Sequence, residues 1–462
     1  MSPEEFRRFG HRVVDWIADY RARVAAEPVL CRAEPGELLA RLPAAPPVEP
    51  AGFDAVLRDL DDLLLPALSH WQHPRFFGYF PSNGDLASVL GDFLSTGLGV
   101  LGLAWQSAPA LTELEQRTTE WLRQMLGLSD AWHGVIQDTA STGSLIAMLC
   151  ARERDTTPLA DKTVYTSGQA HSSIDKAVLL AGFARDRFRK VATDAAFALA
   201  PTALRAAVDA DLANGLQPTA VIATTGTTTT TAIDPVDACA EVAAAHGAWL
   251  HVDAAMAGSA MILPECRTLW HGVERADSIV VNPHKWLGAA FDCSVLFVRD
   301  PDHLVRVMST SPSYLRTTVD DRVVNYRDWG IALGRRFRAL KLWSLIVTHG
   351  TARLQARLRR DLDNARWLAA EIAAASGWRL CAPVPLQTLC VRHEPAGLQG
   401  EALDAHTLAW HDRLTRSGRA WLTPAQLDGR WLVRVSIGAL ATERSHVEEL
   451  WRDMQSSVAP AT

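Results

Sequence analysis

One lysine has surroundings that suit covalent bonding to a carbonyl group. Lys285 follows the apolar stretch Ser278–Val281 and the turn residue Pro283, and it lies between His284 and Trp286. Ligands of parallel-sheet proteins bind at the carboxyl ends of strands. A lysine among apolar and aromatic groups has a lowered pKa, as a Schiff-base lysine requires. The alternative is an ordinary surface lysine that follows a strand.

A carboxylate stands at the end of a second apolar stretch. Asp253 follows Trp249–Val252, and such an aspartate could pair with a protonated pyridine nitrogen and keep a cofactor ring electron-withdrawing. The alternative is an aspartate that caps the next helix. His246 and His251 are near in sequence, but His251 and Asp253 lie among strand residues and no further ligand is close. We therefore expect no metal site.

Two segments rich in hydroxyl groups could hold a phosphate. Thr139–Ser144, which contains Ala140 and Ser141, is followed at once by the helical stretch 145–152. The N-terminus of a helix offers free backbone amides to an anion. Thr224–Thr228 follows another apolar stretch and should lie at the same sheet edge. A plain helix cap and a solvated turn are the alternatives for these two segments.

A histidine completes the group of candidate residues. His171, in the segment Gln169–Ser173, could stack on a planar cofactor ring and contact a substrate carboxylate. A structural histidine with satisfied ring nitrogens is the usual alternative. Each of the four segments alone is weak evidence for a cofactor site. Together they make an ordinary surface lysine at position 285 a much less favourable interpretation.

Three further patterns resemble known motifs but lack their context. Gly97–Gly102 fits the glycine pattern of dinucleotide-binding loops, but residues 86–96 favour a helix where that pattern needs a strand. Ser173–Lys176 matches a penicillin-binding motif without its partner motifs. Arg335–Arg338 is a basic cluster in a chain of net charge −6, and we expect internal ion pairs there rather than a nucleic-acid site.

The elements that must position these side chains alternate between strands and helices from residue 86 to 342. The strands predicted by short β-branched stretches are Thr163–Thr166, Ala220–Thr225, Trp249–Val252, Ser278–Val281 and Ser294–Val298. Helices are predicted between them, at 201–214 and 235–245. This βαβ order predicts an α/β fold with a mostly parallel sheet and helices on both faces.

The two ends of the chain differ from this pattern. Residues 3–25 and 53–68 are predicted to be helices, joined by a proline-rich connector. Near the other end, a helix at 352–375 precedes the short strands Leu389–Arg392 and Trp431–Ser436. We predict three parts: an N-terminal helical dimerisation segment (1–85), a large domain (86–342) and a small α+β domain (343–462).

Composition narrows the class of protein. The chain has 462 residues, of which 48% are hydrophobic and 21% charged, as in globular proteins with a large core. Its net charge of −6 gives no general attraction to nucleic acid or anionic lipid. The seven cysteines are widely spaced without a CxxC pair, which favours a reducing compartment. Neither a signal peptide nor a membrane-spanning apolar run is evident, so we expect a cytoplasmic protein.

Over nearly its whole length, the sequence resembles the group II decarboxylases that depend on pyridoxal 5′-phosphate, specifically the aromatic-L-amino-acid decarboxylase family. Asn282–Trp286 is its most specific motif. Bacterial L-DOPA and aromatic amino acid decarboxylases look most similar, on the basis of Asp138–Thr142 and Pro385–Cys390. The other segments that carry the resemblance are Glu5–Gly10, Glu34–Gly36, Phe77–Pro81, Ala108–Glu115, Pro312–Leu315 and Leu333–Arg338.

The resemblance implies the type I fold of pyridoxal-phosphate enzymes, similar to aspartate aminotransferase, with a seven-stranded, mostly parallel central sheet. It implies that Lys285 binds the cofactor covalently, that Asp253 pairs with the pyridinium nitrogen and that His171 stacks on the ring. The remaining residues implied around the cofactor are Ala140, Ser141 and Asn282 for the phosphate, Thr228 in the same pocket, and His284 beside the lysine.

The family's substrate pocket matches a second set of residues. This set contains Trp71, Tyr79, Phe80, Pro81, Ser82, His171 and His284, with Leu101 and Leu103 contributed by the partner subunit of a homodimer. Ser82 stands where the animal enzymes carry threonine, and Leu103 replaces a phenylalanine. Both departures leave room for a different ring preference.

The implied reaction removes the α-carboxylate of an aromatic L-amino acid and gives an arylalkylamine and CO₂. Tyr314 resembles the loop tyrosine that returns a proton to the substrate carbon, and Tyr314 and His171 together favour amine over aldehyde as product. The possible substrates L-DOPA, 5-hydroxytryptophan, tryptophan, tyrosine and phenylalanine are not ranked by sequence. An aromatic aldehyde synthase and a decarboxylase of a non-aromatic amino acid are the nearest alternatives; an NAD-dependent dehydrogenase and an inactive scaffold belong to other classes.

Overall fold

The computed structural model describes residues 1–310, 319–320 and 322–458. The chain divides into two compact units. The first unit comprises Met1–Pro81, Ala370–Arg379 and Val391–Thr462, and the second comprises Ser82–Ala369 and Leu380–Cys390. The three-part division at residues 85 and 342 stays a prediction.

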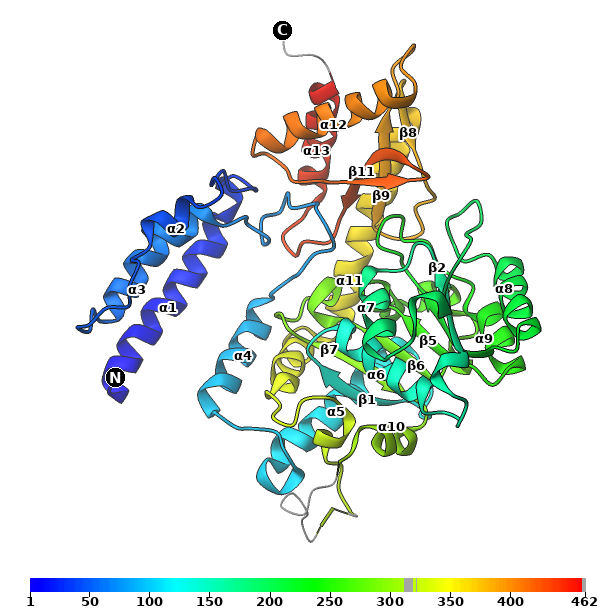
Figure 1. Cartoon of the computed structure of the whole chain (residues 1–462). Coiled ribbons are helices and arrows are strands. Elements are labelled where there is room, and N and C mark those ends of the chain that lie inside the picture. The colour runs from blue at the N-terminus through cyan, green and yellow to red at the C-terminus, as the bar shows by residue number, and fades with distance from the viewer. Residues whose placement is uncertain (311–318, 321, 459–462) are drawn as a thin grey trace. The chain divides into compact units, whose positions relative to one another are not determined.

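The second unit is built on a seven-stranded sheet with the order β1-β7-β6-β5-β4-β2-β3 (Figure 1). Its strands are β1 (His133–Gln137), β2 (Lys162–Ser167), β3 (Phe188–Val191), β4 (Gln217–Thr224), β5 (Trp249–Asp253), β6 (Ser278–Val281) and β7 (Ser294–Val298). Among the described strands of this sheet, β7 alone runs opposite to the other six. The predicted α/β class and mostly parallel seven-stranded sheet are therefore confirmed.

Strand direction brings the candidate residues to one side of the sheet. β1 and β6 are both antiparallel to β7, so β1 runs in the same direction as β6, and β2 to β5 run parallel to β6 as well. The carboxyl ends of β1, β2, β4, β5 and β6 therefore lie at the same edge, where ligands of open α/β sheets bind. The segments that contain Ala140, His171, Thr228, Asp253 and Lys285 all follow these ends.

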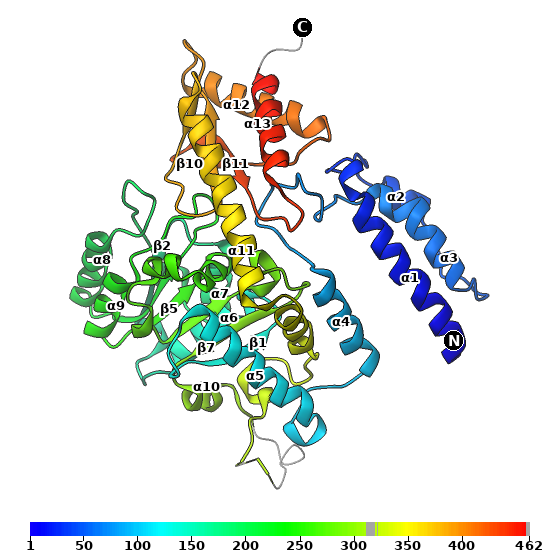
Figure 2. The ribbon, with the colours of Figure 1, turned by 180° about the vertical axis from the view of Figure 1, so that it is seen from behind.

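Helices cover both faces of this sheet (Figures 1 and 2). The helices of the second unit are α4 (Leu86–Leu98), α5 (Pro109–Leu126), α6 (Ala140–Arg152), α7 (Ser172–Leu180), α8 (Pro201–Ala213), α9 (Val236–Ala245), α10 (Pro301–Met308) and most of α11 (Arg338–Ala374). α6, α7 and α10 share a fully buried core with the sheet, in which Ile146, Val178 and Leu296 are completely enclosed. This burial fixes the N-terminus of α6 against the strand ends.

Two glycines determine where α4 ends and where α11 is interrupted. α4 ends at Leu98, and Gly99 follows in the left-handed conformation with φ 63°, so Gly97–Gly102 is a helix terminus rather than a strand–turn–helix loop. In α11, Gly350 has non-helical dihedrals (φ 64°, ψ 164°) and separates two helical segments. The predicted helix at 352–375 corresponds to the second of these segments.

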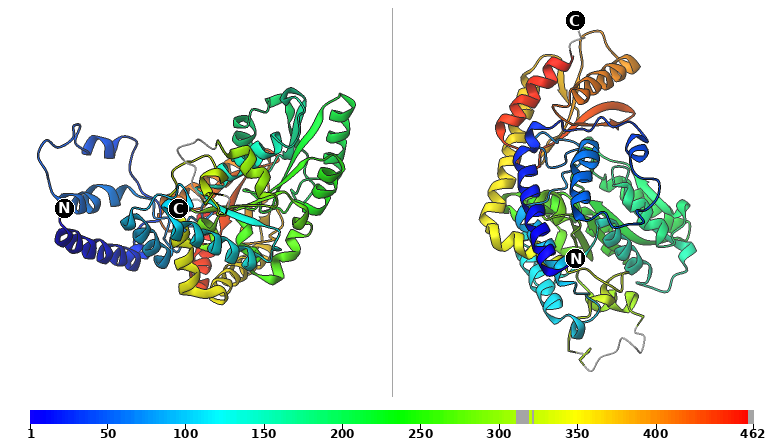
Figure 3. Two further views of the ribbon diagram at one scale, coloured as in Figure 1. Left: turned by 90° about the horizontal axis from the view of Figure 1, so that it is seen from below. Right: turned by 90° about the vertical axis from the view of Figure 1, so that its left-hand side faces the viewer.

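The first unit combines helices with a small sheet. Its helices are α1 (Pro3–Arg23), α2 (Glu37–Arg41), α3 (Phe53–Asp59), α12 (Gly400–Arg416) and α13 (Arg444–Val458), and its sheet has the order β10-β11-β9-β8. The strands are β8 (Trp378–Leu380), β9 (Thr388–His393), β10 (Thr423–Leu427) and β11 (Arg430–Ser436). α1 and α3 lie side by side (Figure 3), with Phe9 and Phe53 rings 5.2 Å apart. In the described part of the chain, no helix is long and apolar enough to cross a membrane.

Candidate active site

The loops after β4, β5 and β6 are joined directly by backbone hydrogen bonds. Thr225 donates its N–H to the Asp253 carbonyl at 2.9 Å, and Asn282 donates its N–H to the Ala255 carbonyl at 3.0 Å. Asp253 is the last residue of β5, and Asn282 directly follows β6. The two candidate residues therefore stand on neighbouring strand ends in a fixed relation.

Lys285 lies in a short helical turn, η10 (Pro283–Leu287), which the loop after β6 forms. Its own backbone leaves the helical conformation (φ −95°, ψ −113°), and the turn ends at Gly288 with φ 96°. The Lys285 carbonyl accepts a hydrogen bond from Asn83 Nδ2 at 3.1 Å. Sequence reasoning missed Asn83, since no local pattern links it to a lysine two hundred residues away.

The carboxylate of Asp253 is nearly buried, with 5% of the residue exposed. One oxygen, Oδ1, accepts the Ala255 N–H at 3.1 Å. The hydrogen bond that this carboxylate accepts from a described residue is made by Oδ1. The other oxygen, Oδ2, can therefore accept a further donor. A buried carboxylate at a strand end suits a protonated ring nitrogen, because the charge pair would form where water is scarce.

His171 is electrostatically coupled to both of these residues. Burial lowers the pKa of His171, the positive charge of Lys285 lowers it further, and the Asp253 carboxylate opposes both effects. His171 Nδ1 accepts the backbone N–H of Ser173 at 3.1 Å and caps α7. In the neutral ring the proton is therefore on Nε2. The structure thus brings both Asp253 and Lys285 within electrostatic range of His171.

The N-terminus of α6 is the candidate anion-binding position. α6 begins at Ala140, and Thr139 makes no side-chain hydrogen bond to its first turn. A Cβ atom at Gly143 would lie 3.0 Å from Val280 Cγ2, so this glycine lets the helix approach β6 closely. Ser141 is exposed at this end of the helix. The free N–H groups and the helix dipole both favour a phosphate here.

Buried polar atoms without partners test whether a polar cofactor fits this place. Asn282 Oδ1 and Thr224 Oγ1 are buried and have no hydrogen-bond partner among the described residues. Buried polar groups are rarely left unsatisfied. Both atoms belong to the strand ends that surround Asp253, so a polar group bound at this edge would fit the residues present.

The threonine-rich loop after β4 is held in a specific shape. Gly226 has φ 85°, and a Cβ atom there would lie 2.6 Å from Ala257 Cβ. Asp234 closes the loop, with carboxylate oxygens that accept the N–H groups of Thr224 and Leu199, each at 2.7 Å. Burial raises the pKa of Asp234 to about 7. Thr228 is half-buried in this loop.

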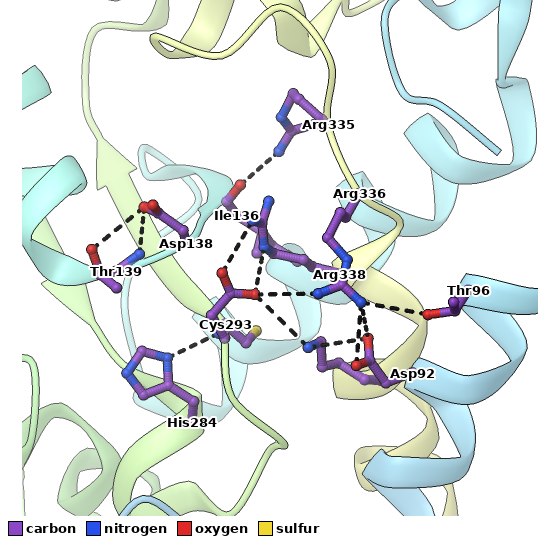
Figure 4. A network of polar contacts seen from close by, with 12 residues as sticks. Asp92, Thr96, Ile136, Asp138, Thr139, His284, Cys293, Arg335, Arg336 and Arg338 are labelled. Carbon is purple, nitrogen blue, oxygen red and sulfur yellow. Dashed lines mark hydrogen bonds and ion pairs between the residues drawn. The ribbon is translucent and has the colours of Figure 1, made fainter. Parts of the chain in front are cut away.

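His284 is a neutral hydrogen-bond donor beside Lys285. Its Nδ1 accepts the Cys293 N–H at 2.9 Å (Figure 4). Burial lowers the pKa of His284 to about 3, and the charge of Lys285 acts in the same direction. The neutral ring therefore has its proton on Nε2.

The basic cluster Arg335–Arg338 forms internal ion pairs, as the sequence predicts (Figure 4). Arg335 donates two hydrogen bonds to the buried Glu115 carboxylate, at 3.0 and 2.5 Å, and one to the Ile136 carbonyl at 2.6 Å. Arg338 pairs with Asp292 at 3.0 Å. These contacts fix the strand that leads into Thr139 and the loop that leads into Cys293.

The residues predicted for the substrate pocket are divided between the two units. Trp71, Tyr79, Phe80 and Pro81 belong to the first unit, and Ser82, Leu101 and Leu103 to the second. Within the first unit, the rings of Trp71 and Tyr79 stack 5.7 Å apart. Tyr314 lies outside the described residues.

Residues 35–394 match the model of the pyridoxal-dependent decarboxylase conserved domain. The chain belongs to this family. The Papaver somniferum tyrosine/DOPA decarboxylase 1 is 38% identical, over 98% of this chain and 93% of that protein. A phenylacetaldehyde synthase of a Rosa hybrid cultivar is 39% identical, over 98% of this chain and 94% of that protein.

Solved structures agree with the family assignment. The crystal structure of Oryza sativa TDC with PLP and tryptamine matches with a TM-score of 0.97 and 36% identity, over 99% of this chain and 98% of that chain. The Catharanthus roseus tryptophan decarboxylase in complex with L-tryptophan matches with a TM-score of 0.95 and 37% identity, over the same shares of the two chains.

Membership settles the class of enzyme. The chain is a pyridoxal-phosphate-dependent decarboxylase, so its cofactor is pyridoxal 5′-phosphate and the predicted fold is confirmed. The expected similarity to bacterial members in particular is not supported, since the curated relatives at 38–39% identity are plant proteins. Sequence reasoning treated His251 only as a possible metal ligand and missed its buried contacts with Ser144 and Ser278, at 3.1 and 2.8 Å.

Proposed function

We propose that this decarboxylase acts on an aromatic L-amino acid and releases the corresponding arylalkylamine and CO₂. The main support is the match over 99% of the chain to a tryptophan decarboxylase in complex with L-tryptophan, with a TM-score of 0.95. The candidate substrates are L-DOPA, 5-hydroxytryptophan, tryptophan, tyrosine and phenylalanine. A comparison of their kcat/KM values would rank them.

The residues at the sheet edge have distinct proposed roles. Pyridoxal phosphate, when bound, supplies an electron-withdrawing ring that accepts the electron pair left by the departing CO₂. Lys285 holds the cofactor covalently, Asp253 keeps a proton on the ring nitrogen, and His171 stacks on the ring. The proposed phosphate ligands are Ala140, Ser141 and Asn282, with Thr228 in the same pocket.

The proposed substrate pocket consists of nine residues that the family resemblance implies. The aromatic side chains of Trp71, Tyr79 and Phe80 would contact the substrate ring, and the neutral imidazoles of His171 and His284 would orient its carboxylate. The full proposed set is Trp71, Tyr79, Phe80, Pro81, Ser82, His171 and His284, with Leu101 and Leu103 from the partner. By fixing the orientation of the substrate, these residues would decide which bond to its α-carbon breaks.

Aldehyde formation is the second candidate function, because a phenylacetaldehyde synthase is as similar to this chain (39%) as a tyrosine/DOPA decarboxylase (38%). We propose that Tyr314 protonates the substrate carbon and so directs the reaction to amine. Aldehyde formation would instead consume O₂ and water and release CO₂, ammonia and hydrogen peroxide.

Product analysis separates the two reactions. Amine, aldehyde, peroxide and CO₂ are measured with L-DOPA, tryptophan and phenylalanine as substrates. Amine equal to CO₂ supports the decarboxylase, whereas peroxide equal to CO₂ would reject it. Tyr314→Phe should keep CO₂ release and divert product to aldehyde, while Tyr20→Phe in α1 serves as control. An unchanged amine yield in Tyr314→Phe would show that Tyr314 is not the proton donor.

A homodimer belongs to the same proposal. α4 exposes an apolar stripe in which Leu90, Leu94 and Leu98 are 53%, 59% and 60% exposed. Such a patch usually marks a protein interface. Sedimentation should show twice the chain mass of 50.4 kDa, and Leu94→Lys should weaken the dimer and the activity together. An active monomer would contradict shared sites.

The proposed compartment is the cytoplasm. All seven cysteines are free thiols in the structure, and most of them are buried. Free buried thiols are usual where the surroundings are reducing. Fractionation of the native cells with an antibody to the chain would test this.

A further inference from the structure

The turn that contains Lys285 is clamped from one side by two charged residues of α11. Arg357 Nη2 donates to the carbonyls of Trp286 and Leu287, at 2.8 and 2.6 Å. Asp361 Oδ2 accepts the indole N–H of Trp286 at 2.9 Å. Arg357 and Asp361 are one helical turn apart, so they face the same neighbour.

The contacts of this clamp are formed away from water. Trp286 is fully buried and Asp361 is 1% exposed. Burial raises the pKa of Asp361 to about 6, and Arg360 is the strongest influence against this rise. Burial lowers the pKa of Arg357 to about 10. At pH 7.5 both residues therefore keep their charges, and hydrogen bonds to charged groups are stronger than neutral ones.

The turn is also held by the segment before α4. Asn83 Nδ2 donates to the Lys285 carbonyl at 3.1 Å, and the Asp85 N–H donates to the Gly288 carbonyl at 3.0 Å. The carbonyls of residues 285 to 288 are thus all engaged, in part by side chains far away in sequence. Because the carbonyl of each of these four residues accepts a hydrogen bond, the backbone of the turn keeps Lys285 in one orientation.

We propose that Arg357 and Asp361 are positioning residues that hold the Lys285 amine in register with Asp253 for cofactor attachment. This inference rests on the proposed role of Lys285. In this proposal, neither Arg357 nor Asp361 touches the substrate or the cofactor. They act through Trp286 and Leu287, and their removal lets the turn, and the amine with it, sample other positions.

The test uses the full-length apo-enzyme titrated with pyridoxal phosphate. Arg357→Met and Asp361→Leu should each weaken cofactor binding about tenfold, as loss of a charge-assisted hydrogen bond predicts. The pH at which the visible absorption band of the lysine–cofactor bond titrates should also shift. With the cofactor saturating, kcat should fall while KM changes little. Arg359→Met is the matched control, because Arg359 lies on the same helix but pairs with the exposed Glu265 at 2.6 Å.

Two further variants keep the test decisive if Asp361→Leu folds poorly. Asp361→Asn retains a neutral acceptor for the Trp286 N–H and should lose less cofactor affinity than Asp361→Leu. Trp286→Phe combined with Asp361→Leu should be no worse than the poorer single variant, since both remove the same hydrogen bond. The proposal would be overturned if Arg357→Met and Asp361→Leu bound the cofactor with wild-type affinity and their absorption band titrated at the wild-type pH. It would also be overturned if the effects of Trp286→Phe and Asp361→Leu on cofactor affinity were independent. Mapping the cofactor lysine in wild type tests the role of Lys285 separately.

Discussion

Ser144 of α6 and His251 of β5 are joined at 3.1 Å between Ser144 Oγ and His251 Nε2, inside the core of the second unit. The other ring nitrogen, Nδ1, lies 2.8 Å from Ser278 Oγ on β6, and Ser278 accepts the Trp249 indole N–H at 2.8 Å. One histidine thus connects the helix that begins at Ala140 to β5, which ends at Asp253, and to β6, which Asn282 directly follows. The candidate anion site and the candidate ring partner are coupled through it.

Replacing this histidine should destabilise the fold. His251→Phe leaves the hydroxyls of Ser144 and Ser278 without their buried partner, and an unsatisfied buried polar group costs about 1–3 kcal/mol. The urea midpoint of the apo-enzyme should therefore fall. His271→Phe is the control, because the His271 side chain is 83% exposed. A midpoint equal to that of the control would show that the bridge contributes nothing.

The same residue predicts a pH effect of known sign. Burial lowers the pKa of His251 from 6.5 to about 4, so between these values the unfolded chain binds a proton that the folded protein does not. The stability gained from the neutral ring is present above pH 6.5 and is lost as the pH falls towards 4. The stability difference between wild type and His251→Phe should therefore be smaller at pH 5 than at pH 7.5. A difference that grows at pH 5 would contradict the assignment.

The Glu115–Arg335 ion pair should matter far more than its exposed neighbour. Glu115 is fully buried and Arg335 is 5% exposed, so Glu115→Ala leaves a buried guanidinium without its partner and should cost about 3–5 kcal/mol. Arg336→Ala removes a half-exposed pair with Asp92 and should cost less than about 1 kcal/mol. Urea unfolding of both variants measures the two costs. Equal costs would show that burial does not set the strength of these pairs.

Gly226 should be irreplaceable in the loop after β4. Gly226→Ala places a side chain at φ 85° and 2.6 Å from Ala257 Cβ; the backbone conformation alone costs about 1–2 kcal/mol. The loop that contains Thr228 should shift, and pyridoxal-phosphate affinity should fall. Gly97→Ala, which meets nothing within 4 Å, is the control and should bind the cofactor normally. Normal cofactor affinity in Gly226→Ala would remove this loop from the site.

The strands that the sequence predicts best are those buried on both faces. Ser278–Val281 and Ser294–Val298 have the predicted bounds, because each is a short β-branched stretch without a polar face. β1 and β3 were not predicted. In β3, Arg189 and Lys190 interrupt the apolar pattern, and β1 contains Gly134, which packs where a Cβ atom would lie 2.7 Å from Thr119 Cβ.

The residues of the candidate site also include some that the sequence predicts and some that it does not. Residues at strand ends, such as Asp253 and Asn282, can be identified from sequence because their position follows from the βαβ order. Asn83, Arg357 and Asp361 cannot, since their contacts with the Lys285 turn arise only when distant segments pack together. Local sequence patterns thus predict which residues form the candidate site, but not which distant side chains hold those residues in position.

Borohydride reduction of the enzyme with bound pyridoxal phosphate, followed by peptide mapping, identifies the lysine that binds the cofactor. Reduction makes the bond between lysine and cofactor permanent, so the modified residue can be read by mass spectrometry. We expect one phosphopyridoxyl group, on the peptide that contains Lys285. Modification of Lys162, Lys176, Lys190 or Lys341 instead, or of no lysine, would contradict it.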